Sequence, residues 1–149
     1  MGISETGENL MIRPQIIAAG SIHTVGIRPD GTVEAVGANY GCAVDHWTYI
    51  DQIAAGGRNT IGLRFDGTVV AVGDPSNGEC YVRHWSTIVQ VASELDSVVG
   101  LMWDGTIIWS KGGCTGVKGV RYIASGEFQT IGLCPDGTVI AVGQGVHTR

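Results

Sequence analysis

The chain has 149 residues and a net charge of −5, with 44% hydrophobic and 15% charged residues. This length allows a well-buried core, and the composition excludes intrinsic disorder. The negative charge, with no basic block, argues against nucleic-acid binding, and no apolar run approaches the length of a membrane span. The 24 glycines follow no triplet period, which excludes collagen, and residues 1–14 lack the apolar segment of a secretory signal.

One phrase recurs four times along the chain. Its copies read IAAGSIHTVGIRPDGTVEAVG from Ile17, IAAGGRNTIGLRFDGTVVAVG from Ile53, VASELDSVVGLMWDGTIIWSK from Val91 and IASGEFQTIGLCPDGTVIAVG from Ile123. Self-similarity at such a period is the signature of a repeat architecture. We predict a single domain over residues 1–149, with repeats near 17–52, 53–90, 91–122 and 123–143.

Each copy predicts short strands in the same order. A stretch such as IAAG precedes a β-branched run, and an Asp-Gly pair then favours a tight hairpin into a second β-branched run. The linking segments, beginning at Tyr40, Asn77 and Gly112, would supply a fourth strand, and no window has the period of an amphipathic helix. Four strands in about 37 residues match a β-propeller blade, so we predict an all-β propeller built of four blade repeats.

The shared core, followed by a Gly-Cys or Gly-Glu-Cys element and the pair His-Trp, resembles the regulator-of-chromosome-condensation repeat family. The resemblance spans residues 12–143 and is strongest to the short bacterial form, as in propeller-type β-lactamase inhibitory proteins. In the third copy Glu94 replaces the glycine found at Gly20, Gly56 and Gly126. The resemblance implies a bacterial, non-catalytic propeller that binds a protein through loops on one face, whereas a shared scaffold alone does not convey the exchange-factor activity of the eukaryotic namesake.

The fourth copy lacks a segment for its last strand. We expect residues 10–16 to supply that strand, with Met11 at the position of Trp47. Closure within one chain would give a four-bladed ring, and closure between two chains would give an eight-bladed ring with two-fold symmetry. We favour the homodimer, because an open arc would expose two apolar sheet faces. A fragment of a longer propeller is the third alternative.

Several residue sets resemble reactive sites, and each has a structural explanation. Cys42, Cys80 and Cys114 take equivalent places in successive repeats, too far apart to bridge, so we expect unpaired buried thiols and a reducing, cytoplasmic compartment. The aspartates of the Asp-Gly pairs fit turn chemistry, and Trp47 and Trp85 fit packing between blades. We therefore expect no catalytic residue, no metal and no cofactor.

The positions that vary between otherwise similar repeats are the candidates for binding a protein partner. Most of them lie in the loops after the first strand of each copy, and Tyr40 lies in the loop at 38–40. These loops and the loop at 74–77 would share one face of the propeller, and the Asp-Gly hairpins would lie on the opposite face. The candidates are Ile22, His23, Tyr40, Arg58, Asn59, Leu95, Asp96, Glu127, Phe128 and Gln129. One alternative is an enzyme, a lyase or hydrolase, with His23, Asp96 and Glu127 in a central channel; another is an orphan scaffold without a specific partner.

Overall fold

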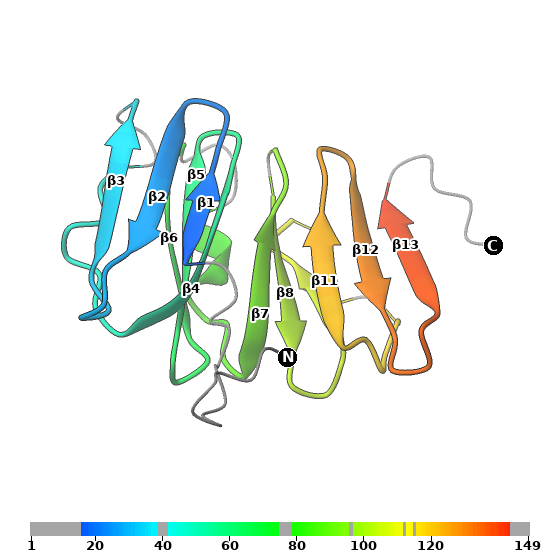
Figure 1. The fold of residues 1–149 in the computed structure, drawn as a ribbon. Coiled ribbons are helices and arrows are strands. Elements are labelled where there is room, and N and C mark those ends of the chain that lie inside the picture. Colours follow the sequence, from blue (N-terminus) through cyan, green and yellow to red (C-terminus); the bar gives the residue numbers. More distant parts are fainter. Residues whose placement is uncertain are drawn as a thin grey trace, which may run out of the picture.

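The computed structural model describes residues 16–38, 42–74, 79–95, 97–111, 113–114 and 116–143. Within these segments four antiparallel sheets follow one another along the chain, which we call blades 1 to 4 (Figure 1). Blade 1 holds β1 (Ile17–Ala19), β2 (His23–Ile27) and β3 (Val33–Gly37), and blade 2 holds β4 (Ile50–Gly56), β5 (Asn59–Arg64) and β6 (Val69–Val72). Blade 3 holds β7 (Ile88–Ser93), β8 (Val98–Met102), β9 (Ile107–Trp109) and β10 (Gly113–Cys114), and blade 4 holds β11 (Tyr122–Ser125), β12 (Gln129–Leu133) and β13 (Val139–Gly143).

The first strand of each blade lies on the inner side of the arc. Strand β4 contacts both β1 and β7, and β7 also contacts β11, so these strands run beside one another across the blades. Two glutamines tie them together: Gln52 donates to the carbonyl of Val89, and Gln90 forms two hydrogen bonds with the backbone of Ile123. This arrangement of small sheets around an inner row of strands confirms the predicted all-β propeller repeat.

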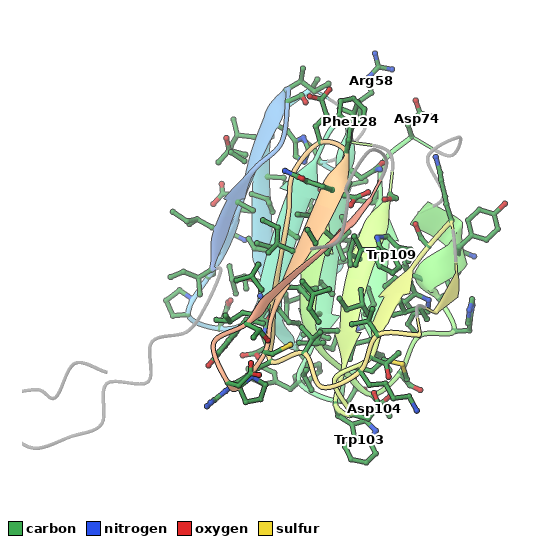
Figure 2. The ribbon with its side chains drawn as sticks, turned by 90° about the vertical axis from the view of Figure 1, so that its right-hand side faces the viewer. Arg58, Asp74, Trp103, Asp104, Trp109 and Phe128 are labelled. Carbon is green, nitrogen blue, oxygen red and sulfur yellow. The ribbon has the colours of Figure 1, made fainter. Side chains whose placement is uncertain are left out.

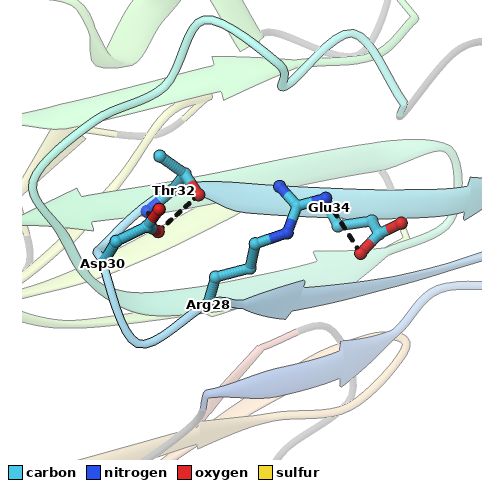
Figure 3. A network of polar contacts seen from close by, with 4 residues as sticks. All are labelled: Arg28, Asp30, Thr32 and Glu34. Carbon is cyan, nitrogen blue, oxygen red and sulfur yellow. Dashed lines mark hydrogen bonds and ion pairs between the residues drawn. The ribbon is translucent and has the colours of Figure 1, made fainter.

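The Asp-Gly hairpins form as the sequence predicted. In blade 1, Asp30 accepts hydrogen bonds from the backbone N–H and the hydroxyl of Thr32, at 3.0 and 2.6 Å, and Arg28 pairs with Glu34 beside the turn (Figure 3). The Thr hydroxyl, followed by the Thr backbone N–H, lowers the pKa of each turn aspartate. The glycine after Asp30 has a φ of 81°, a conformation that other residues rarely adopt. The carboxylates therefore serve the turns.

Each pair of neighbouring blades encloses its own hydrophobic cluster. Trp47 is 2% exposed in the cluster between blades 1 and 2, and Trp85 is 4% exposed between blades 2 and 3. The rings cover glycines of the following blade, because a Cβ on Gly62 or Gly100 would approach them to 3.0 or 2.9 Å. The predicted placement of both tryptophans between blades is confirmed.

The prediction of a fourth strand in every blade is wrong in the described segments. Only blade 3 has one, the short β10, while the corresponding part of blade 2 holds the 3₁₀ helix η3 (Glu79–Val82). The linking segments satisfy their backbone groups in local turns, as in the bonds from Trp47 N–H to Val44 and from Trp85 N–H to Val82. Each turn ends at a tryptophan whose ring packs in the blade interface. Of the proposed closing strand, residues 10–15 lie outside the described residues.

The thiols depart in part from the expectation. Cys42 and Cys134 are unpaired but only half-buried, and the Cys42 thiol donates to the carbonyl of Ala38. The side chains of Cys80 and Cys114 lie outside the described residues.

Candidate protein-binding face

The two ends of the blades carry different loops. We call the end with the loops after the first strands, residues 20–23, 56–59, 94–95 and 126–129, the loop face. Figure 2 shows Arg58, Asp74 and Phe128 at this end, and Trp103 and Asp104 at the opposite, hairpin end. The backbone N–H of Ala38 bonds to Ile22, and Asp74 approaches both Arg58 and Asn59, so the loops after the third strands adjoin the loop face as predicted.

All four blades contribute to a hollow of about 370 Å³ on the loop face. Glycine is required around it, because the loop of one blade packs directly on the loop of the next. A Cβ on Gly56 would overlap the backbone of Glu94, and one on Gly57 would overlap Leu95. The hollow is lined by Ala19, Gly20, Ser21, Gly56, Gly57, Ser93, Glu94, Leu95, Gly126 and Glu127.

Several candidate residues project from the blades around this hollow. Phe128 is 62% exposed, Ile22 is 45% exposed and Leu95 is 36% exposed, so three separate blades offer an apolar side chain. Arg58 is exposed and forms an ion pair with Asp74 at 3.5 Å. Glu127 and Gln129 are exposed beside Phe128. The loop face therefore combines separated apolar contacts with both signs of charge.

Two candidates lie inside the fold, which departs from the prediction. His23 is 4% exposed, and its Nε2 lies 2.7 Å from the hydroxyl of Thr60 in blade 2. Burial lowers the pKa of His23 and so favours the neutral ring, and the backbone of Asn59 partly offsets this effect. Asn59 is fully buried and accepts a hydrogen bond from the backbone N–H of Asp74. Each residue is the first of the second strand of its blade, and its side chain is buried within the fold.

Two further candidates, Tyr40 and Asp96, lie outside the described residues. Of the residues considered for an enzyme with a central channel, the described His23 ring is held between blades and Glu127 is exposed on the loop face. In the part of the chain that is described, no cluster of three His, Cys, Asp or Glu side chains could hold a metal ion. The same segments contain no helix with the length and apolar content needed to cross a membrane.

Sequence reasoning did not identify the role of Glu94. Its carboxylate accepts hydrogen bonds of 2.7 Å from Ser97 in its own blade and from Thr130 in blade 4. Glu94 thus links blades 3 and 4, as His23 links blades 1 and 2. Its departure from the repeat glycine was the available signal, because a charged side chain at a crowded position needs partners.

The hairpin end carries exposed aromatic residues that the sequence reasoning did not single out. Tyr49 is 74% exposed, Phe65 62% and Trp103 72%. Phe65 and Trp103 precede the Asp-Gly pairs of blades 2 and 3, where blades 1 and 4 have Pro29 and Pro135. This variation was visible in the sequence, but no function was predicted for these positions.

Comparison with protein families gives a match to the regulator of chromosome condensation (RCC1) repeat over residues 50–79. This segment contains β4 to β6, which form blade 2, one of the two interior blades. No curated protein sequence matches the chain.

Several solved structures share the fold at low sequence identity. The ectodomain of the Arabidopsis thaliana receptor kinase ACR4 has a TM-score of 0.71 at 18% identity, over 87% of this chain and 49% of that one. Prp20p, the RCC1 of Saccharomyces cerevisiae, has a TM-score of 0.69 at 18% identity, over 85% and 43%. Human WBSCR16 has a TM-score of 0.66 at 15% identity, over 87% and 47%. The chain thus spans less than half the length of each of these structures.

Proposed function

We propose that the chain is a non-catalytic propeller scaffold that binds a protein partner through its loop face. The observation that carries this proposal is the set of exposed apolar side chains, Ile22, Leu95 and Phe128, placed by three different blades around one hollow. Exposed aromatic and arginine side chains on rigid supports are typical anchors of protein interfaces. Prp20p has been studied for binding to Gsp1p and histones and is also seen bound by Kap60, which supports protein binding as a use of this fold.

The rigid blades position these anchors at little entropic cost. Blade 2 holds Arg58 through Asp74, and blade 4 holds the loop of Phe128 through the bond from Gly126 N–H to the carbonyl of Gln129. A partner would insert apolar groups between Phe128 and Ile22 and place a cationic group near Glu127. Pre-organised loops lose little conformational freedom on binding, which leaves more of the contact energy for affinity.

The two phenylalanines of the chain provide a matched experiment. Phe65 and Phe128 are each 62% exposed, but they lie on the hairpin end and the loop face respectively. A photoreactive residue at position 128 or 65 identifies the bound protein, and titration calorimetry then measures its affinity for Phe128→Ala and Phe65→Ala. We expect Phe128→Ala to weaken binding at least tenfold and Phe65→Ala to leave it unchanged. Equal losses, or a loss with Phe65→Ala alone, would contradict the loop face.

We further propose that the chain associates with a second copy of itself. Support comes from the apolar side chains left exposed on the two outermost blades: Ile17 is 74% exposed in blade 1, and Val139 is 61% exposed in blade 4. Four blades of this chain do not cover these faces themselves. An eight-bladed assembly would place two loop faces on one ring, and a partner could then be bound by either or both.

A further inference from the structure

Residues that are buried in the interior blades are exposed at the two ends of the arc. One position of the inner strand is occupied by Ile53, Val91 and Ile123 in blades 2 to 4, each at most 5% exposed. Ile17 holds this position in blade 1 and is 74% exposed. The side of blade 1 that would meet a preceding blade is therefore left uncovered by the described residues.

The opposite side of blade 4 shows the same contrast. Three positions face the following blade, and in blade 3 they are occupied by Val99, Leu101 and Ile107, all at most 1% exposed. In blade 4 they are occupied by Ile131 at 38%, Leu133 at 39% and Val139 at 61%. Blade 4 thus presents a surface of the kind that forms the core of every interior blade interface.

The glycines of the middle strands add a second observation. Gly62, Gly100 and Gly132 lie under Trp47, Trp85 and Val120, and a Cβ there would meet those side chains at 3.0, 2.9 and 2.9 Å. Gly26 holds the same position in β2, and among the described residues a Cβ on it would come near Ile16 and Ile17 alone, at 3.8 Å. Space for an incoming side chain is therefore present on the open side of blade 1, next to Ile17 and Val36.

A threonine that bonds to the preceding blade recurs at one repeat position, although its partner comes from different loop positions. His23 of blade 1 reaches Thr60 of blade 2, and Thr130 of blade 4 is bonded by Glu94 of blade 3. Thr24 takes the place of Thr60 and Thr130 in blade 1, but it is exposed. Gln129 takes the place of His23 in blade 4 and is also exposed. The two ends thus carry the two halves of one inter-blade hydrogen bond.

We infer that the open face of blade 4 in one copy packs on the open face of blade 1 in a second copy. Two such joints, related by a two-fold axis, close a ring of eight blades, and in each joint Gln129 of one copy bonds to Thr24 of the other. This inference rests on the self-association proposed above and names the surfaces and the atoms that form it. The joint repeats an interface that the chain already forms between its own blades, so it needs no new kind of contact.

The repeat geometry favours this pairing over a face meeting itself. Two blade 4 faces in contact would place Leu133 and Val139 against their own copies and leave the space over Gly26 empty. In the proposed joint, apolar side chains of blade 4 meet Ile17 and Val36, as those of blade 1 meet the equivalent Ile53 and Val72 of blade 2. The number of exposed apolar side chains is consistent with this, since a soluble monomer rarely leaves large apolar faces uncovered.

Two charged variants test the joint on the full chain. Ile17→Lys blocks the face of blade 1 and Leu133→Asp blocks the face of blade 4, while Phe65→Asp alters an exposed apolar residue outside both faces. Light scattering on a sizing column measures the mass. We expect about 31 kDa, twice the 15.6 kDa of one chain, for the wild type and Phe65→Asp, and one chain for each joint variant alone.

An equimolar mixture of Ile17→Lys and Leu133→Asp gives the deciding result. In a mixed dimer one joint has both native faces, and the other brings Lys against Asp, so we expect the mixture to restore the dimer. A pairing of like faces predicts no such rescue, because each mixed contact would keep one altered face. A wild-type monomer, or assemblies larger than two chains, would overturn the closed ring, and a wild-type dimer without rescue would overturn the joint while leaving self-association standing.

The hydrogen bond between copies has its own test. Thr24→Val and Gln129→Ala should each raise the dimer dissociation constant by about tenfold, since each lost bond occurs twice in the ring. The double variant should show no further increase if the two side chains bond to one another. Additive effects would overturn the Gln129–Thr24 pairing.

Discussion

Removal of the Trp85 ring should be among the most destabilising single changes in the chain. The side chain is 4% exposed in the cluster between blades 2 and 3 and lies against Gly100. Burial of a tryptophan removes roughly 150–250 Å² from water, which corresponds to about 4–6 kcal/mol at about 25 cal/mol per Å². Measured large-to-small changes of this kind cost about 3–5 kcal/mol, so we expect Trp85→Ala to lower the free energy of unfolding by about that amount.

Trp103→Ala is the matched control, because that ring is 72% exposed at a hairpin tip. Its expected effect is within about 0.5 kcal/mol. Urea unfolding followed by circular dichroism measures both variants, at one protein concentration because association with a second copy would add to the apparent stability. In thermal unfolding the Trp85 change corresponds to a decrease in Tm of roughly 6–20 °C. A loss below about 1 kcal/mol for Trp85→Ala, or equal losses for both tryptophans, would refute the assignment of Trp85 to the blade interface.

Three further changes test local features. Because burial lowers the pKa of His23 below 6.5, protonation favours the unfolded chain, and the free energy of unfolding should decrease as the pH falls from 7 to 5. Urea titrations at each pH should show a weaker pH dependence for His23→Gln. An unchanged pH dependence would contradict the burial of a neutral ring. Thr87 has a φ of 63°, which is strained for a β-branched residue, so Thr87→Gly should raise stability by up to about 1 kcal/mol, and a loss of stability would contradict the strain. Gly57 has a φ of 43° and lies against the backbone of Leu95, so Gly57→Ala should lower the free energy of unfolding by more than about 2 kcal/mol in chemical unfolding. A Cβ on Gly126 would meet, among the described residues, Gln129 at 3.9 Å, so Gly126→Ala should cost clearly less in the monomer. Similar costs for the two variants would refute the close packing of the loops.

The repeat and its hairpins could be predicted from the sequence because they depend on neighbouring residues. An Asp-Gly pair followed by Thr forms its turn through bonds that span two residues, and all four copies carry these residues. Burial of Trp47 and Trp85 could also be predicted, because a large apolar ring at the same position of two repeats is expected to pack in the same way in both. Local chemistry thus determined the blade and the number of copies.

The tertiary structure decided which loop residues are available to a partner. His23 and Phe128 occupy neighbouring positions of the same repeated loop, yet His23 is buried on Thr60 whereas Phe128 is exposed. The linking segments form turns rather than the predicted strands, and each turn ends at a tryptophan that packs on the next blade. Contacts of this kind join residues more than 30 positions apart, and no pattern within one repeat contains them. The sequence by itself determined the blade, and the packing of one blade on the next determined which side chains remain for binding.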